Sequence, residues 1–303
     1  MTSFFSVCIP LLNRGKTIFS TLSSIAEQAY RNFDVKIVVY KGVDNTNEEV
    51  TRFFASNIYS QNKFEYEIEY SDKAFDDWNG PVKIAKGKYI AMLEGDDQFT
   101  PEHLHKAYKY LSKNNNVGIY STGNQNKKRE LFGLIKSADY FRYIYSMVAV
   151  PPPSETIFVR LDKNSCQYYY NHASFIYAPE IDLYLRIAGV GYDAYYANSQ
   201  DVWRYPSSYK QNSWKYFHDP FAIVNKYKNS SGITTELFVK TKHRIAILAL
   251  KYFLMSIYRK DGVANEFQEH LINELGILQF CKYLVQIISN KIVKVFLLIG
   301  NGK

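Results

Sequence analysis

Short apolar segments alternate with helical segments through the first 122 residues of this chain of 303 residues. Strand-like runs occupy 4–10, 34–40, 88–93 and 118–122, and residues 64–70 alternate Phe, Tyr and Ile with Glu, as in a half-exposed strand. Between them lie segments with apolar residues at helical spacing or with helix-start signals. Parallel strands need crossover connections, which are usually helices. The alternation therefore predicts an α/β fold with a mostly parallel central sheet and helices on both faces.

Four loops follow predicted strands at their carboxyl ends. They are 11–16, 41–46, 71–79 and 94–98. Ligands of open α/β sheets bind outside the carboxyl ends of the strands. We therefore expect these four loops to form the binding site together, although they lie far from one another in the sequence.

The fourth strand runs directly into three carboxylates, Glu94, Asp96 and Asp97, with Gly95 among them. Carboxylates this close repel one another, and one of them is pushed toward protonation. A divalent cation removes the conflict, because Mg²⁺ and Mn²⁺ prefer carboxylate oxygens and also bind diphosphates. The alternative is a solvated acidic turn before a helix that begins near Thr100. The position at the carboxyl end of a strand favours the metal site.

The first 105 or so residues resemble bacterial family 2 glycosyltransferases of the GT-A fold. The blocks that carry the resemblance are Ser-Val-Cys-Ile-Pro-Leu-Leu-Asn-Arg at 6–14, Gln-Ala-Tyr-Arg-Asn-Phe-Asp at 28–34, Asp-Asn-Thr at 44–46, and Ala-Lys-Gly-Lys-Tyr-Ile at 85–90 leading into Leu-Glu-Gly-Asp-Asp at 93–97. The last block resembles the Asp-x-Asp metal motif of that family in a Glu-Gly-Asp-Asp form. The resemblance implies a GT-A, Rossmann-like domain that binds a nucleotide-sugar donor.

The resemblance also implies roles for individual residues. Asp96 would bind a Mn²⁺ or Mg²⁺ ion that bridges the two phosphates of the donor, and Asp97 would support the loop. Glu94 would face the ribose or the metal. The remaining residues expected on the donor side are Pro10, Leu12, Arg14, Tyr40, Asp44, Asn79, Gly95 and Arg204.

A second block at 179–192, Pro-Glu-Ile-Asp-Leu-Tyr-Leu-Arg-Ile-Ala-Gly-Val-Gly-Tyr, resembles the Glu-Asp-x-Asp-Leu-x-Leu-Arg segment of the family. The catalytic base of an inverting transfer then falls on Glu180, which would take the proton of the acceptor hydroxyl. The alternative for Glu180 is an acid in a helix first turn, favoured by the helix dipole. Asp182 and Arg186, four residues apart, are predicted to form a local ion pair.

Three positions depart from the family pattern. Tyr40 and Lys41 stand where paired Asp residues are usual, so either Tyr40 stacks on the base or Lys41 reaches a phosphate. A loop acid (Asp72, Asp76 or Asp77) is the alternative for the base contact. Trp78 replaces the Arg of an Ala-Arg-Asn segment, and is expected to pack on the donor or to seal the core. Pro206 replaces the His of a Tyr-Arg-x-His segment, while Arg204 is kept and is expected to contact the diphosphate.

The predicted domain organisation has two parts. Residues 1–235 form the catalytic domain, with a nucleotide-sugar-binding half at 1–122 and an acceptor-binding half at 123–235. Residues 236–303 form a C-terminal helical region with ten Lys and Arg against five Asp and Glu, which is +5 of the net charge of +8. Its segments 240–258 and 278–298 are predicted either to pack as helices on the protein or to lie at an anionic membrane surface.

No signal peptide and no run of about 20 apolar residues is expected. Three scattered cysteines form no disulfide framework, which suits a reducing cytoplasm. The predicted function is an inverting, metal-dependent transfer from a nucleotide diphosphate sugar, with UDP favoured, to a saccharide or lipid-linked saccharide in surface polysaccharide synthesis. The alternative is an inactive relative that binds sugar nucleotides or glycans. The bases are scattered, so no nucleic-acid partner is expected.

Overall fold

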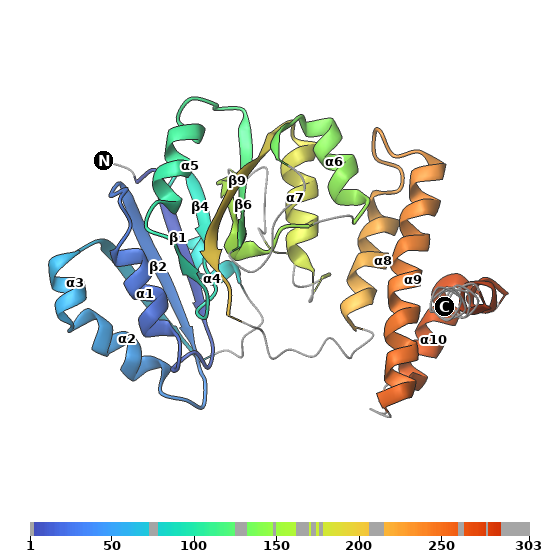
Figure 1. Ribbon diagram of the computed structural model, residues 1–303, viewed down its shortest axis with the longest axis horizontal. Helices are drawn as coiled ribbons and strands as arrows, with labels where there is room; N and C mark the ends of the chain where they lie inside the picture. The colour runs from blue at the N-terminus through green and yellow to red at the C-terminus, as the bar shows by residue number, and fades with distance from the viewer. Residues whose placement is uncertain are drawn as a thin grey trace, which may run out of the picture. The chain divides into compact units, whose positions relative to one another are not determined.

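The computed structural model describes residues 3–72, 78–124, 132–147, 150–161, 170, 174–175, 178–205, 215–259, 264–276 and 278–285. The chain forms two compact units. The first comprises 1–144 and 149–207, and the second comprises 145–148 and 208–303. Figure 1 shows the sheet and its helices in the first unit and a helical second unit.

In the described residues of the first unit, nine strands form one sheet in the order β3-β2-β1-β4-β8-β6-β9-β5, with β7 paired to β9. The strands are β1 (Phe5–Leu11), β2 (Phe33–Tyr40), β3 (Glu65–Ser71), β4 (Tyr89–Met92), β5 (Gln98–Phe99), β6 (Val117–Asn124), β7 (Gly133–Ile135), β8 (Thr156–Val159) and β9 (Asp193–Trp203). The pairs β1–β2, β2–β3, β1–β4 and β6–β9 are parallel. The strands β5, β7 and β8 pair antiparallel with their neighbours.

The strand order reverses at β1, because β2 and β3 lie on one side of it and β4 lies on the other. Such a switch point opens a crevice between the loops that follow the two diverging strands. Here those loops are 12–17 after β1 and 93–97 after β4. The sheet topology therefore places two of the four loops predicted from sequence side by side.

Helices cover the sheet (Figure 1), as α1 (Ile18–Ala26), α2 (Thr46–Phe54), α3 (Asn57–Gln61), α4 (Asn79–Lys83), α5 (His103–Leu111), α6 (Ser137–Tyr145), the 3₁₀ turn η1 (Pro153–Glu155) and α7 (Pro179–Gly189). α4 packs on the face of the sheet to which Cys8 of β1 and Val38 and Tyr40 of β2 point. The thiol of Cys8 lies 3.5 Å from the Pro81 carbonyl. A Cβ atom at Gly80 would meet Val38 and the Tyr40 hydroxyl.

The five strands predicted from the sequence all form, with ends shifted by one or two residues. β9 was not predicted, because polar residues fill 198–201 in the middle of its 11 residues. The helix after β1 begins only at Ile18, since residues 13–15 are tied to the loop after β2, as described below. The antiparallel direction of β8 follows from its pairing and was also not predicted.

The second unit consists, in its described part, of α8 (Lys215–Tyr227), α9 (Thr235–Arg259), α10 (Ala264–Leu275) and a helical segment at 278–285. Phe217 of α8 packs on Tyr252 of α9 with ring centres 5.2 Å apart. Because of this packing α8 groups with the second unit, whereas it was expected within the catalytic domain ending at 235. The functional boundaries at 122 and 235 stay predictions.

One face of the helical segment 278–285 packs against α9. Phe280 lies 5.9 Å from Phe253, and Tyr283 lies 4.4 Å from His243, between ring centres. No helix within the described residues is both long enough and apolar enough to span a membrane. Residues 286–298 of the predicted membrane-surface segment lie outside the described residues.

One buried histidine has an unusual environment in the first unit. His103 is 0% exposed, and its ring stacks on Phe99 with ring centres 4.2 Å apart. Neither ring nitrogen has a hydrogen-bond partner among the described residues. Burial lowers the pKa of His103 from 6.5 to about 4, against the opposing effect of the Asp201 carboxylate. The folded protein therefore holds this imidazole neutral at pH values where an exposed imidazole is charged.

We expect this histidine to weaken the fold in mild acid. Its contribution is complete above pH 6.5 and is lost as the pH falls toward 4, because the unfolded chain binds the proton first. His103→Phe should therefore retain about 2 kcal/mol more of its pH 7.5 stability at pH 5 than the wild-type protein does. Urea denaturation at the two pH values measures this. The matched control is His105→Phe, at an exposed position of the same helix. Equal acid losses in His103→Phe and wild type would contradict the prediction.

Candidate functional site at the carboxyl edge of the sheet

The loop after β1 is fixed to the loop after β2 by hydrogen bonds. Asn13 has a left-handed backbone (φ 54°), and its side-chain oxygen accepts from the Val43 amide at 2.8 Å. The Arg14 amide donates to the Thr46 hydroxyl at 2.7 Å. The Gly15 amide donates to a carboxylate oxygen of Asp44 at 2.9 Å. The backbone at 13–15 is therefore held in a non-helical conformation beside β2.

Asp44 uses both carboxylate oxygens in this connection. Oδ2 accepts from Gly15, and Oδ1 accepts from the Thr46 amide at 3.1 Å and the Thr46 hydroxyl at 2.5 Å. Burial acts to raise the pKa of Asp44, but these hydrogen bonds outweigh it and lower that pKa. The resemblance placed Asp44 on the donor side of the site. In the structure it joins the two loops, and direct contact with a donor stays a prediction.

The segment 94–97 after β4 packs closely against the same loop. The Gly95 carbonyl accepts hydrogen bonds from the hydroxyls of Thr17 at 2.8 Å and Thr21 at 3.1 Å. A Cβ atom at position 95 would lie 2.4 Å from Leu11 and 2.9 Å from the Arg14 stem. Only glycine fits this position without a shift of its neighbours. Thr17 and Thr21 were not singled out in the sequence, since isolated threonines in a helix carry no functional pattern.

Two of the three carboxylates face Arg204 and the 3₁₀ turn η1. Asp97 is 2% exposed, accepts from the Tyr205 amide at 3.1 Å and lies 3.5 Å from Nε of Arg204. The Glu94 amide donates to the Ser154 hydroxyl at 3.0 Å. Burial raises the pKa of Glu94 to about 7, with the neighbouring Asp97 carboxylate acting in the same direction and Arg204 against it. The expected repulsion within the cluster is thus present.

Asp96 is the carboxylate that remains for a metal ion. Its Oδ1 is buried and has no hydrogen-bond partner in the described part of the chain, while Oδ2 lies 3.5 Å from the guanidinium of Arg14. A buried carboxylate oxygen without a donor fits a hard divalent cation. The described residues contain no group of three His, Cys, Asp or Glu side chains placed to hold a metal. Phosphate oxygens of a bound ligand would have to complete the coordination.

The other predicted donor-side residues take structural positions. Asn79 is buried and exchanges two hydrogen bonds of 2.7 Å with the backbone N–H and carbonyl of Tyr170. Tyr40 is buried, with its hydroxyl toward Gly80, so its ring offers little surface for stacking. Pro10 lies within buried β1 and Leu12 directly after it, half-buried. Asp76, Asp77 and Pro206 lie outside the described residues.

Glu180 lies in the first turn of α7. Its neighbour Tyr170 has a pKa raised well above the ordinary value, first by burial and then by Tyr184 and by the carboxylates of Glu180 and Glu94 among others. Glu180 and Glu94 are thus both near one buried tyrosine. Asp182 and Arg186 form the predicted local ion pair at 2.9 Å, which is confirmed. The Trp78 ring packs edge-on against Tyr170 with centres 5.5 Å apart.

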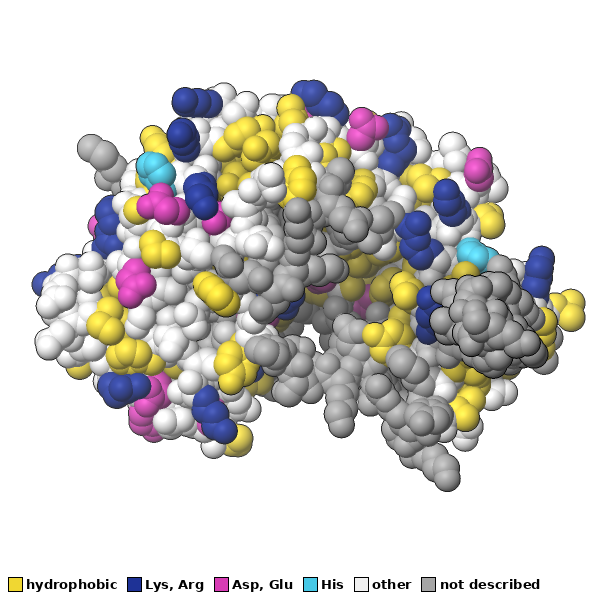
Figure 2. Space-filling model, viewed as in Figure 1, with side chains coloured by type: hydrophobic (Ala, Val, Ile, Leu, Met, Phe, Trp, Pro, Cys, Tyr) yellow, Lys and Arg dark blue, Asp and Glu magenta, His cyan; other side chains and the backbone are white. Residues whose placement is uncertain are grey.

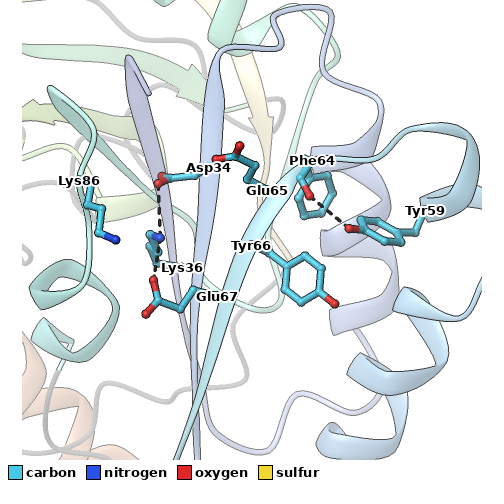
Figure 3. Close-up of a pocket in the computed structure, with 8 residues that line it drawn as sticks. All are labelled: Asp34, Lys36, Tyr59, Phe64, Glu65, Tyr66, Glu67 and Lys86. Carbon is cyan, nitrogen blue, oxygen red and sulfur yellow. Dashed lines mark hydrogen bonds and ion pairs between the residues drawn. The ribbon is translucent and has the colours of Figure 1, made fainter. Parts of the chain in front are cut away.

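A shallow cavity of about 600 Å³ lies at the opposite edge of the sheet, where β2 and β3 begin (Figure 3). Three of its charged groups pair with one another, because Nζ of Lys36 lies 3.4 Å from Asp34 and 2.8 Å from Glu67. Tyr59, Phe64 and Tyr66 lie on the other side of β3 in the same view. Since open α/β sheets bind ligands at the carboxyl edge, the crevice between β1 and β4 is the better candidate.

Solved structures share this fold. TarS of S. aureus, in its complex with UDP-GlcNAc, gives a TM-score of 0.63 at 18% identity over 92% of this chain and 81% of that chain. The mannosyltransferase PcManGT from Pyrobaculum calidifontis, in complex with GDP-Man and Mn²⁺, gives a TM-score of 0.57 at 14% identity over 94% of this chain and 88% of that chain. At such identities the likeness shows the fold alone. The predicted GT-A fold class is confirmed.

Sequence comparison agrees with the resemblance. Residues 6–146 match the family model described as Glycosyl transferase family 2. This part of the chain is therefore similar to that family, as the sequence blocks predicted.

Individual relatives match over different lengths. WfgD from Escherichia coli, a UDP-Glc:alpha-D-GlcNAc-diphosphoundecaprenol beta-1,3-glucosyltransferase, is 30% identical over 115 residues, which are 38% of this chain and 44% of the relative. AmsB, an amylovoran biosynthesis glycosyltransferase of Erwinia amylovora, is 30% identical over 110 residues, or 36% of each chain. WfaP from Escherichia coli, likewise a UDP-Glc:alpha-D-GlcNAc-diphosphoundecaprenol beta-1,3-glucosyltransferase, is 24% identical over 248 residues, which are 80% of this chain and 90% of the relative. The match thus spans less than half of WfgD and AmsB.

The close approach at Gly95 gives a test of the crevice. We expect Gly95→Ala to lower the free energy of unfolding by about 1–3 kcal/mol, because the added methyl group overlaps Leu11 and the Arg14 stem. The control is Gly189→Ala, where the nearest atom, in Phe141, is 3.7 Å from the added Cβ. Chemical denaturation of both variants measures the difference. Equal stabilities would show that the segment 94–97 is not packed as described.

Proposed function

We propose that the chain is an inverting, metal-dependent glycosyltransferase that moves a sugar from a nucleoside diphosphate donor, UDP favoured, to a saccharide or lipid-linked saccharide acceptor. The observation that carries the proposal is the cluster of charges after β1 and β4, where Arg14 lies on Asp96 and Arg204 lies on the neighbouring Asp97. A carboxylate for a metal and cations for a diphosphate are the groups that this chemistry requires. The match of residues 6–146 to the family model supports it.

Within this proposal the chain's residues have distinct tasks. Asp96 would hold Mn²⁺ or Mg²⁺, which supplies charge stabilisation for the departing nucleoside diphosphate. Arg204 and Arg14 bind phosphate oxygens, and Asp97 positions Arg204 through its contact at 3.5 Å. Gly95 and Asp44 shape the crevice by the close approach and hydrogen bonds described above. Asn79 positions Tyr170, whereas Pro10, Leu12 and Tyr40 form the wall behind the nucleotide.

Glu180 is proposed as the base. Its carboxylate takes the proton from the acceptor hydroxyl while the hydroxyl oxygen attacks the anomeric carbon on the side opposite the diphosphate. This attack inverts the configuration of that carbon. WfgD and WfaP are beta-1,3-glucosyltransferases, and the same stereochemistry is proposed here. Residues 1–122 would bind the donor and 123–235 the acceptor, at a site reached from the cytoplasm.

The test is a thermal-shift screen of the full chain against UDP-glucose, UDP-GlcNAc and GDP-mannose, with and without Mn²⁺. A ligand that binds the native state raises the melting temperature. We expect a UDP-sugar to raise it in the presence of Mn²⁺, and Asp96→Asn to remove the metal-dependent part of the shift. The control is Asp139→Asn, at an exposed carboxylate paired with Arg142.

Turnover separates the enzyme from an inactive relative. Glu180→Gln should bind the same donor but lose transfer by about a hundredfold or more, since general base catalysis contributes factors of that size. Donor binding with no transfer or donor hydrolysis in the wild-type protein would support the non-catalytic alternative. Full turnover in Asp96→Asn would contradict the metal assignment.

We also propose that the C-terminal segment contacts an anionic membrane surface. On the helix at 278–285, Leu278 is 85% and Val285 is 63% exposed, on the side away from Phe280 and Tyr283. After Glu274 the sequence contains four lysines and no acidic residue. Exposed apolar side chains with lysines beside them favour a surface of anionic lipid.

Vesicle sedimentation tests this contact. The full chain should bind vesicles with 30% anionic lipid more tightly than neutral vesicles, and Lys282→Gln should weaken binding roughly fivefold, since one lysine contributes about 1 kcal/mol at such a surface. Lys251→Gln, which removes an exposed lysine of α9, is the control. Binding that does not depend on anionic lipid would contradict the proposal.

A further inference from the structure

Arg14 has an anchored backbone and a side chain that reaches across the crevice. Its amide is held by the Thr46 hydroxyl at 2.7 Å, and Gly95 lies directly under its aliphatic stem. The loop that carries it is fixed further by Asp44 and Asn13. The backbone and the aliphatic stem of Arg14 are therefore held from two sides, by the loop after β2 and by the segment after β4, while its guanidinium lies at the end of the side chain.

The guanidinium of Arg14 lies on the carboxylate that is proposed to hold the metal. Nη2 of Arg14 is 3.5 Å from Oδ2 of Asp96, with the two side chains 33% and 19% exposed. The second oxygen of Asp96 is buried without a hydrogen-bond partner in the described residues. One half of the carboxylate is thus neutralised by a cation of the chain itself, and the other half has no donor among those residues.

We propose that Arg14 is an internal counter-ion that competes with the divalent cation for Asp96 and moves to the diphosphate of the donor when the metal binds. This inference rests on the proposed function. A guanidinium and a divalent cation repel each other at one carboxylate. The planar guanidinium also suits phosphate oxygens, to which it can donate two hydrogen bonds. A metal ion that binds alone must displace the Arg14 guanidinium from Asp96 when no other anion is present to pair with it. When a diphosphate binds together with the metal ion, the diphosphate provides that anion.

The consequence is a thermodynamic coupling between metal and nucleotide. Because coupling between two ligands is reciprocal, UDP should tighten Mn²⁺ binding by the same factor by which Mn²⁺ tightens UDP binding. Arg14 would supply part of that factor. It acts by weakening the metal site when the nucleotide is absent and by strengthening the nucleotide site when the metal is present.

The test measures Mn²⁺ binding to the full chain directly, by the electron paramagnetic resonance signal of free Mn²⁺, with and without UDP. Without UDP, Arg14→Gln should bind Mn²⁺ roughly three- to tenfold more tightly than wild type, because a competing charge is removed. The factor by which UDP tightens Mn²⁺ binding should fall at the same time. Lys16→Gln removes one exposed charge from the same loop and should change Mn²⁺ affinity less than about twofold.

Two further variants make the outcome decisive. Arg14→Lys keeps the charge but loses the planar fork, so it should bind Mn²⁺ alone as wild type does and show a reduced effect of UDP. Asp96→Asn in the Arg14→Gln background should abolish the tightened Mn²⁺ binding. If Mn²⁺ binding depends on Asp96 but is unchanged in Arg14→Gln, the counter-ion role is overturned and the proposed function stands. If no variant binds Mn²⁺ even with UDP, the metal assignment itself is overturned.

Discussion

The contact of Gly95 with the loop after β1 is the constraint on which the candidate site depends. The hydroxyls of Thr17, just before α1, and of Thr21, within α1, hold the Gly95 carbonyl, and the missing side chain lets Leu11 and the Arg14 stem lie against the backbone. The carboxylates on either side of this glycine cannot move independently of α1. A segment with three acidic residues would otherwise favour an open, solvated turn. Here it is held in a crevice that the strand order creates.

The sequence predicted the fold where burial makes the pattern plain. β1 and β2 are buried along their whole lengths, so their apolar runs were sufficient. β9 shows the limit of such patterns, because polar residues interrupt it, yet three other strands pair with it. Its end carries Arg204 and Tyr205 to Asp97. Only long-range pairing, which no local pattern encodes, places those residues at the site.

The site residues divide in the same way. Asp96 and Glu94 were found because three carboxylates directly after a strand are a strong local signal. The sequence did not predict the hydrogen bonds of Ser154, Thr17 and Thr21 to the backbone of 94–95. A hydroxyl group takes such a role only through the backbone group that it meets in space. Asn79 was expected at the donor from a resemblance of its segment, and the structure gives its amide to the backbone of Tyr170. A sequence block can be kept in a family for such a contact between distant segments as well as for ligand binding.

The hydrogen bonds between Asn79 and Tyr170 also bear on how such a protein diverges. Both bonds go to the main chain of Tyr170, so they require no particular side chain at position 170 other than one that is not proline and that fills the buried space of the ring. Position 79, in contrast, must offer a donor and an acceptor together, which an aspartate does not. Substitutions of similar volume at 170 can therefore change a group whose pKa responds to Glu180 and Glu94 while both hydrogen bonds remain. Position 170 thus tolerates more kinds of side chain than position 79 does.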